Sequence, residues 1–457
     1  MRARAANSIG AHDEALRGYR VALALSPGDM TLAARALDEG LAAGDRSLAL
    51  TAARALEKAG KLRVDGRLLL LGEALRNREW RAAGIHIDRI EEDEVFSFLA
   101  PLLRAWAAQG SRKGDPVAIL TAIKDNPLAA TYAVEQKAFL LLAAGRKAEG
   151  LAALGPVLAQ AGTRSARLRI AAAAMLARKG DKTAALGLLQ GDSEPIMIAR
   201  RIVESGKTLP GALSDAASGS AELLVRIAID LNAQNVPALA LDFARLGTFM
   251  APDNSEAWIV TGELLAASDQ HGSALAALAA IPAGDPFAGS VEDSRIGLLL
   301  ASGRSDEALA LAKAETESRP NDASGWTRLG DLLSQTERSG EAADAYGRAL
   351  ALVRADSGSS AREWTLLLRQ GGALTQAGRW PEGKKALEDA YKLAPEEPIV
   401  LNYLGYSQLE RRENVAEAER LIREAARLQP DNMAITDSLG WAHFLRGDLP
   451  AAITLLE

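Results

Sequence analysis

Small and bulky residues recur at fixed distances in this chain, with a period of about 34 residues, which is typical of stacked helical hairpins. Counting from Gly330, the residues at +12, +16 and +19 are Ala342, Tyr346 and Ala349. A similar order, shifted by one residue in one case, follows four other glycines: Gly262, Gly371, Gly405 and Gly440. Such a repeat constrains the fold more strongly than any single motif, because every unit must fit against the next.

The spacing has a physical explanation in a pair of antiparallel helices. Small residues at the start and at +12 let the two helices cross closely, and the bulky residue at +16 fills the space beside the crossing. A proline near +24, such as Pro395 or Pro430, cannot continue the second helix and ends it. One hairpin cannot bury its own apolar faces, so the hairpins must stack into a solenoid.

The composition agrees with a helical fold. Hydrophobic residues make up 48% of the chain and aromatic residues only 4%, and most of the apolar residues are alanine and leucine. Both favour helices, because alanine loses no side-chain entropy in a helix and leucine loses little. Alternating runs of Val, Ile and Thr, which mark strands, are scarce. We therefore predict an all-α fold, an α-solenoid of about thirteen hairpins.

One irregular stretch interrupts the repeat. The equivalent positions Ala173 and Ala228 are separated by one period plus about 21 residues. We predict a degenerate N-terminal array at residues 1–190, a break with an orphan helix at 191–220, and a C-terminal array at 221–457. The last repeat is cut short, and only Met1–Ser8 are left for the first helix of the first repeat, so we expect a shortened or processed chain.

Charge and residue usage argue against several classes of protein. The net charge is −6, and the 53 basic and 59 acidic residues are interspersed, whereas nucleic acid binding normally requires a basic stripe. The absence of cysteine excludes disulfides and thiolate chemistry. No apolar run approaches the roughly 18 residues of a membrane-spanning helix. We expect no nucleic acid partner and no direct insertion of this chain into a membrane.

No arrangement of residues predicts catalysis, a cofactor or a metal site. The four histidines have no partner at metal-ligand spacing. His86 and the acids after it, in HIDRIEEDE, are better explained as a helix end followed by acids that complement the dipole of the next helix. The stretch RIVESGKT lacks the leading glycine and the preceding strand of a phosphate-binding loop. We therefore predict a non-catalytic protein without cofactors.

The candidate functional surface is the concave face that the first helices of such hairpins form. We expect its C-terminal part to bind proteins or peptides, because it combines aromatic and hydrogen-bonding side chains. The candidate residues are Asn402, Tyr406, Leu409, Asp437, Trp441, Phe444 and Asp331. Most positions on this face are acidic or neutral. This disfavours a cluster of lysine and arginine side chains that would bind the terminal carboxylate of a partner peptide. Alternatively, further helices cover Trp441 and Phe444 and make them core residues.

These hairpins resemble the tetratricopeptide repeat, which implies a protein-binding solenoid. The last two repeats also resemble those of proteobacterial outer-membrane lipoproteins that act as adaptors for a carboxy-terminal processing protease. The residues that carry this resemblance are Asn402, Gly405, Tyr406, Asp437, Ser438, Gly440 and Trp441.

The second resemblance implies an adaptor that presents substrates to an envelope protease. The protein would then be periplasmic or associated with the outer membrane if an export signal precedes this sequence, and cytoplasmic otherwise. The alternatives are a scaffold for a secretion, cell-wall or polysaccharide-export assembly, and the regulatory part of a larger enzyme.

Overall fold

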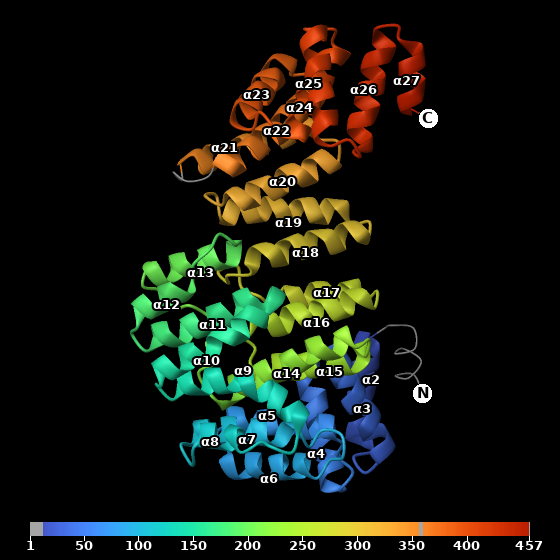
Figure 1. Ribbon diagram of the computed structural model, residues 1–457. Helices are drawn as coiled ribbons and strands as arrows, with labels where there is room; N and C mark the ends of the chain where they lie inside the picture. The colour runs from blue at the N-terminus through green and yellow to red at the C-terminus, as the bar shows by residue number, and fades with distance from the viewer. Residues whose placement is uncertain (1–11, 356–359, 457) are drawn as a thin grey trace. The chain divides into compact units, whose positions relative to one another are not determined.

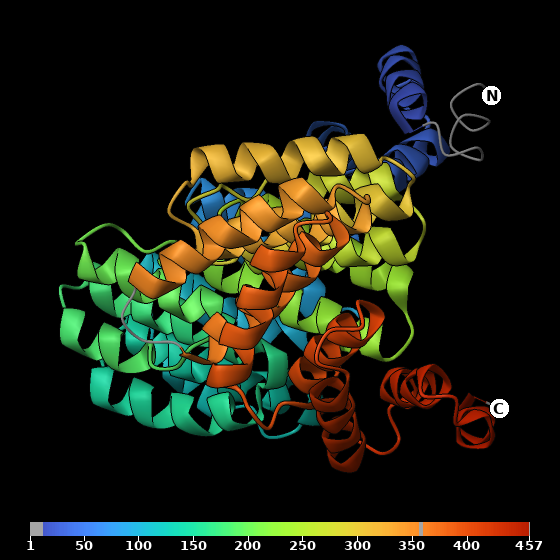
Figure 2. The ribbon, with the colours of Figure 1, turned by 90° about the horizontal axis from the view of Figure 1, so that it is seen from above.

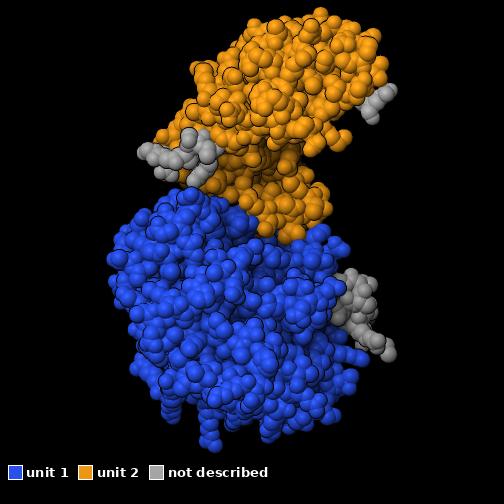
Figure 3. All heavy atoms as spheres, in the orientation of Figure 1, with its two compact units in different colours: residues 1–291 blue, residues 292–457 orange. Residues whose placement is uncertain are grey.

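The computed structural model describes residues 12–355 and 360–456, which form α-helices and one short 3-10 helix and contain no β-strand (Figure 1). The predicted all-α solenoid is confirmed. The chain divides into two compact units, Met1–Val291 (unit 1) and Glu292–Glu457 (unit 2), shown in blue and orange in Figure 3. The segment that we predicted as a break, residues 191–220, lies inside unit 1.

The described part of unit 1 consists of consecutive helical hairpins from α3–α4 onward, preceded by α2, with one additional helix, α13, between α12 and α14. Its elements are α2 (His12–Leu25), α3 (Met30–Ala43), α4 (Arg46–Lys58), α5 (Val64–Arg76), α6 (Trp80–Glu91), α7 (Leu99–Ser111), α8 (Pro116–Thr121), α9 (Pro127–Ala143), α10 (Lys147–Gln160), η1 (Gly162–Arg164), α11 (Ser165–Arg178), α12 (Lys182–Leu188), α13 (Glu194–Glu204), α14 (Ala216–Ala233), α15 (Pro237–Met250), α16 (Ser255–Ala267) and α17 (His271–Leu278).

Unit 2 continues the pattern, and its successive hairpins are rotated relative to one another (Figures 1 and 2). The first helix, α18 (Ala288–Ala301), crosses the boundary between the units. The others are α19 (Ser305–Ser318), α20 (Ala323–Gln335), α21 (Ser339–Ala355), α22 (Ser360–Gln376), α23 (Trp380–Leu393), α24 (Pro398–Glu410), α25 (Val415–Leu428), α26 (Met433–Leu445) and α27 (Leu449–Leu456).

The turn inside a hairpin requires a residue in the left-handed backbone conformation, directly followed by the start of the next helix. Gly44 ends α3 with φ 78°, and Asp45 then caps α4 by accepting a hydrogen bond from the backbone N–H of Leu48. Gly378 and Gly447 take the same left-handed conformation after α22 and α26, with φ of 76° and 81°. Glycine adopts this conformation without the steric cost of a Cβ atom.

The helix crossings show why the repeat needs glycine at its first position. A Cβ atom at Gly330 would lie 2.6 Å from the ring of Tyr346, and one at Gly371 would lie 2.7 Å from Leu387. A Cβ atom at Gly262 would lie 2.8 Å from the side chain of Leu278. In each hairpin the glycine faces the bulky residue at +16, as the spacing predicts.

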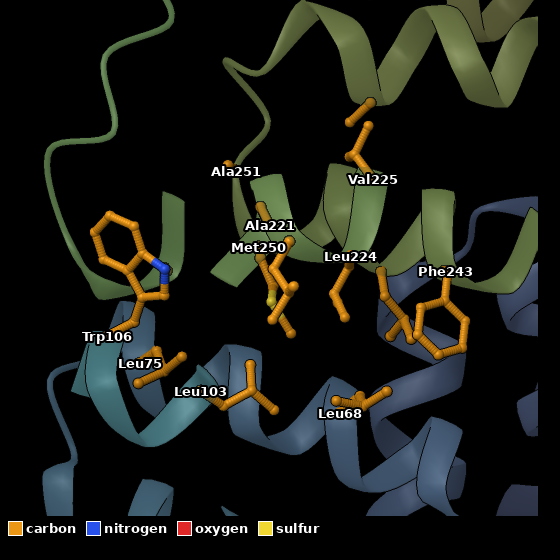
Figure 4. Packing of buried hydrophobic residues seen from close by; sticks show 14 of the residues in the cluster. Leu68, Leu75, Leu103, Trp106, Ala221, Leu224, Val225, Phe243, Met250 and Ala251 are labelled. Atoms are coloured by element: carbon orange, nitrogen blue, oxygen red, sulfur yellow. The ribbon is translucent and has the colours of Figure 1, made fainter. Parts of the chain in front are cut away.

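The hairpin α14–α15 packs across the first helices of the N-terminal hairpins. Helix α14 contacts α5, α7 and α9, and α15 contacts α3 and α5. Figure 4 shows the apolar side chains that meet there, which include Leu68, Leu75, Leu103, Trp106, Leu224, Phe243 and Met250. A Cβ atom at Gly219 of α14 would lie 2.2 Å from the Trp106 ring, so glycine makes this approach possible. These first helices therefore have an intramolecular partner, which the repeat pattern did not predict.

A buried network of charged side chains connects α9, α11, α14 and α16. Arg164 donates hydrogen bonds to Glu135 at 2.8 Å, to Glu222 at 2.9 Å and to Glu256 at 3.1 Å. Arg167 donates a second hydrogen bond to Glu222, at 2.8 Å. All five side chains are buried, and Glu222 is completely so. Such a network stabilises the fold only while it is complete, because a lone buried charge is costly.

The ionisation of the network is uneven. Burial, partly offset by the arginines, raises the pKa of Glu256 to about 7 and also raises the pKa of Glu135. For Glu222, burial acts in the same direction, but the attraction of Arg167 and Arg164 is stronger and lowers its pKa. Glu222 is therefore the carboxylate of the network that stays charged at neutral pH and pairs with both arginines.

Asp242 in α15 makes the stability of unit 1 dependent on pH. Burial, together with repulsion from Asp65 and Asp38 on the neighbouring helices, raises its pKa to about 7, and Arg63 offsets this only in part. The folded state thus holds a proton that the unfolded chain, with a pKa near 3.8, releases. The contribution of Asp242 to the free energy of unfolding therefore falls as the pH rises from about 4 to about 7.

We expect Asp242→Asn to remove this penalty. At pH 8 the variant should gain about 2 kcal/mol in the free energy of unfolding, a figure reduced for the partial exposure of Asp242. At pH 5 the gain should be less than half as large, because most of the fall in stability lies between pH 5 and pH 7. Urea denaturation at both pH values measures the difference, and an equal effect at pH 5 and pH 8 would show that Asp242 is not the titrating group.

Candidate functional site

The candidate site lies on the first helices of the last two hairpins of unit 2, α24 and α26. Asn432 caps α26 by accepting hydrogen bonds from the backbone N–H groups of Ala434 and Ile435. The buried residues Ile435, Ser438 and Ala442 face the fold. This leaves another stripe of α26 exposed, which contains Asp437, Trp441 and Phe444, because residues four and three positions apart lie on one helical face.

Two aromatic rings dominate the exposed stripe. Trp441 is 38% exposed and Phe444 is 47% exposed. Their ring centroids lie 5.1 Å apart with an interplanar angle of 19°, so the rings are stacked. Stacking fixes the two side chains relative to each other, and a rigid aromatic surface loses little entropy when it binds a partner.

Asp437 stands one helical turn before Trp441 and is exposed. Its carboxylate forms no ion pair with any described residue, unlike the other carboxylates on the described first helices of unit 2. Glu363 of α22, for example, accepts a hydrogen bond from Arg354 at 2.7 Å. The aromatic pair thus has an uncompensated negative charge beside it.

Helix α24 contributes two half-buried polar residues, Asn402 and Tyr406. Tyr406 precedes Trp441 by one repeat, since each follows the glycine of its own first helix. Burial and a hydrogen bond with Glu410 raise the pKa of Tyr406, which keeps the hydroxyl protonated at neutral pH. The carbonyl oxygen of Asn402 has no hydrogen-bond partner among the described residues. We name the side chains of Asn402, Tyr406, Asp437 and Trp441 the C-terminal first-helix surface.

The prediction that Leu409 belongs to this surface is wrong. Its side chain is 0% exposed and packs in a cluster with Ala418, Ile422 and Ala442. The physical reason is the next first helix, α26, which contacts α24 and places Ala442 over this position. Phe444 is the equivalent residue one repeat later and is exposed. Among the described residues, Trp441 and Phe444 are both exposed and are not core residues.

Asp331 lies on α20, two hairpins before α24, and already has partners. It accepts hydrogen bonds from the Tyr346 hydroxyl at 2.7 Å and from Arg369 Nη1 at 2.7 and 2.8 Å. Its charge is therefore compensated within the chain. Sequence reasoning missed Arg369, although its place on the next first helix, close to one repeat after Asp331, is a signal that could have found the pair.

The described residues do not bring together three or more side chains that could hold a metal ion. His86 is buried in α6, where its Nδ1 lies 3.6 Å from Glu57, and burial lowers its pKa. Within the same described residues, none of the helices combines the length and the apolar character needed to cross a membrane.

Comparison with known proteins identifies the repeats. A tetratricopeptide repeat family model matches residues 298–360, 368–432 and 409–457, which confirms the repeat prediction. The TPR repeat-containing protein PA4667 of Pseudomonas aeruginosa is 41% identical over 58 residues, which are 13% of this chain. The match spans only 10% of that relative's length.

Solved structures show weaker similarity. The APC/C hetero-tetramer Cut9–Hcn1 aligns with a TM-score of 0.38 and 13% identity over 96% of this chain and 95% of that chain. MamA from Desulfovibrio magneticus aligns with a TM-score of 0.31 and 18% identity over 37% of this chain and 90% of that chain. Similarity at this level supports no inference about function. Tetratricopeptide repeat proteins as a class are protein-interaction scaffolds.

Proposed function

We propose that this chain is a non-catalytic scaffold that binds a protein or peptide through its C-terminal first-helix surface. The observation that carries the proposal is the exposed, stacked pair Trp441–Phe444 next to Asp437, which forms no ion pair with a described residue. Binding hot spots are enriched in such aromatic side chains, surrounded by polar groups that orient the partner. In unit 1 the first helices α3, α5, α7 and α9 are covered by α14–α15, so unit 2 is the better candidate for partner binding.

As the specific role, we propose presentation of substrates to a carboxy-terminal processing protease. This role is supported by the sequence resemblance at Asn402, Tyr406, Asp437 and Trp441. A scaffold for a secretion, cell-wall or polysaccharide-export assembly would use the same surface, and the identity of the captured partner distinguishes the two roles.

Trp441→Ala tests the proposal. We expect the dissociation constant for the natural partner to rise at least about fivefold, since a central aromatic contact is worth more than about 1 kcal/mol. The helical content should not change, because the indole is partly exposed. Affinity capture with this chain as bait identifies the partner, and calorimetry on the purified pair measures the affinity.

Met433→Ala is the matched control. Met433 lies on the same helix and is 81% exposed, but it is not part of the C-terminal first-helix surface. The Met433→Ala variant should bind the partner with the same affinity as the wild type. Equal affinity of all three proteins would mean that the partner binds elsewhere.

A further inference from the structure

The charges on the first helices of unit 2 are almost completely paired within the chain. On α18, Arg295 pairs with Glu292, and on α20, Arg328 pairs with Glu315. On α22, Arg369 pairs with Asp331. As a result, none of the arginine side chains described on these first helices is free to receive an anionic partner.

The carboxylates on the same helices are also compensated, with one exception. Asp293, Asp331 and Glu363 have arginine partners, and Glu410 of α24 lies 3.8 Å from Arg411. Asp437 is the one carboxylate on these helices without a cation among the described residues. The surplus of acids in this part of the sequence, 27 acidic against 20 basic residues from position 292 onward, adds a negative background field.

Because the unpaired carboxylate and the stacked rings share one stripe of α26, they favour the same kind of ligand. A lysine or arginine side chain can place its cationic end at Asp437 while its apolar stem, or an apolar neighbour, covers Trp441 and Phe444. Aromatic faces also attract cations directly, and tryptophan does so most strongly.

We propose that the C-terminal first-helix surface, with Phe444, takes a partner segment in which a lysine or arginine stands beside an apolar side chain. This inference rests on the proposed function, because it specifies the partner of the same surface. A segment that ends in a carboxylate or is rich in acids is excluded by the same argument, since it would meet Asp437 with no described free cation nearby.

The test is selection of a phage-displayed library of random short peptides on the complete chain, on Asp437→Asn and on Trp441→Ala. Peptides selected by the wild type should be enriched in lysine or arginine next to an apolar residue. This enrichment should disappear on Asp437→Asn. For a selected peptide, the dissociation constant should rise about threefold or more on Asp437→Asn, and wild-type binding should weaken with added salt.

Asp431→Asn is the matched control, because Asp431 is an exposed carboxylate in the loop before α26. This variant should select the same peptides as the wild type. Selected peptides that depend on Trp441 but show no preference for cations, or prefer acids, would overturn this inference and leave the proposed function standing. Failure of the wild type to select any peptides beyond those of Trp441→Ala would overturn both.

Discussion

Replacing Arg164 with methionine should lower the free energy of unfolding of unit 1 by about 3–5 kcal/mol at pH 8. The substitution keeps the unbranched side chain but leaves Glu135 and Glu256 buried with little compensation, and Glu222 with Arg167 as its only arginine partner. Chemical denaturation measures the loss. Hydrogen–deuterium exchange should place the loss in α9, α11, α14 and α16, which the network connects.

The same variant should recover part of its stability at acid pH. The pKa of Glu256 is already about 7 and that of Glu135 is raised. Without the guanidinium both pKa values should rise further, so the two carboxyl groups are neutral at pH 5 and their burial costs less. Arg146→Met, at an exposed pair with Glu149, serves as the control and should unfold like the wild type. If Arg164→Met also unfolds like the wild type at pH 8, the buried network does not stabilise the packing of α14.

Gly219→Ala should cost about 3 kcal/mol, through overpacking against Trp106. The new methyl group would lie 2.2 Å from the indole ring, which is fully buried and cannot swing away without losing its hydrogen bond to Gln136 at 2.8 Å. Either the ring must rotate or α14 must move away from α7. The thermal unfolding curve measures the loss, and the fluorescence of Trp106 should change with it.

Gly84→Ala, in the middle of α6, should have the opposite effect and raise the free energy of unfolding. No atom lies within 4 Å of a Cβ atom built there, so alanine should stabilise the helix by about 0.5–1 kcal/mol. If both glycine variants were stabilised, the close contact of α14 with α7 would not exist in solution.

The repeat could be predicted from the sequence because it depends on contacts between residues that are close together in the sequence. Gly330 and Tyr346, for example, are sixteen positions apart in the sequence and meet at the crossing of two neighbouring helices. The packing of α14–α15 on α3, α5, α7 and α9 could not be predicted this way, since it joins helices far apart in the sequence. The run of small residues AASGSA at 216–221 is the signal that points to it.

The site was predictable only in part, for a related reason. Position within the repeat places Tyr406 and Trp441 on equivalent sides of their helices, but exposure depends on the next hairpin. Leu409 is covered by Ala442, whereas Phe444, in the equivalent position, is exposed. Position within the repeat also predicts Asp331 on this face, and only the structure shows that Arg369 compensates its charge.

The most direct test of the proposed function is site-specific photo-crosslinking in the native host. A benzophenone amino acid placed at Tyr406, on the C-terminal first-helix surface, should crosslink one partner protein reproducibly. The same group at Arg420, exposed on the second helix α25, should not. Crosslinks from position 420 and none from position 406 would contradict the proposal that this chain binds its partner through its first helices.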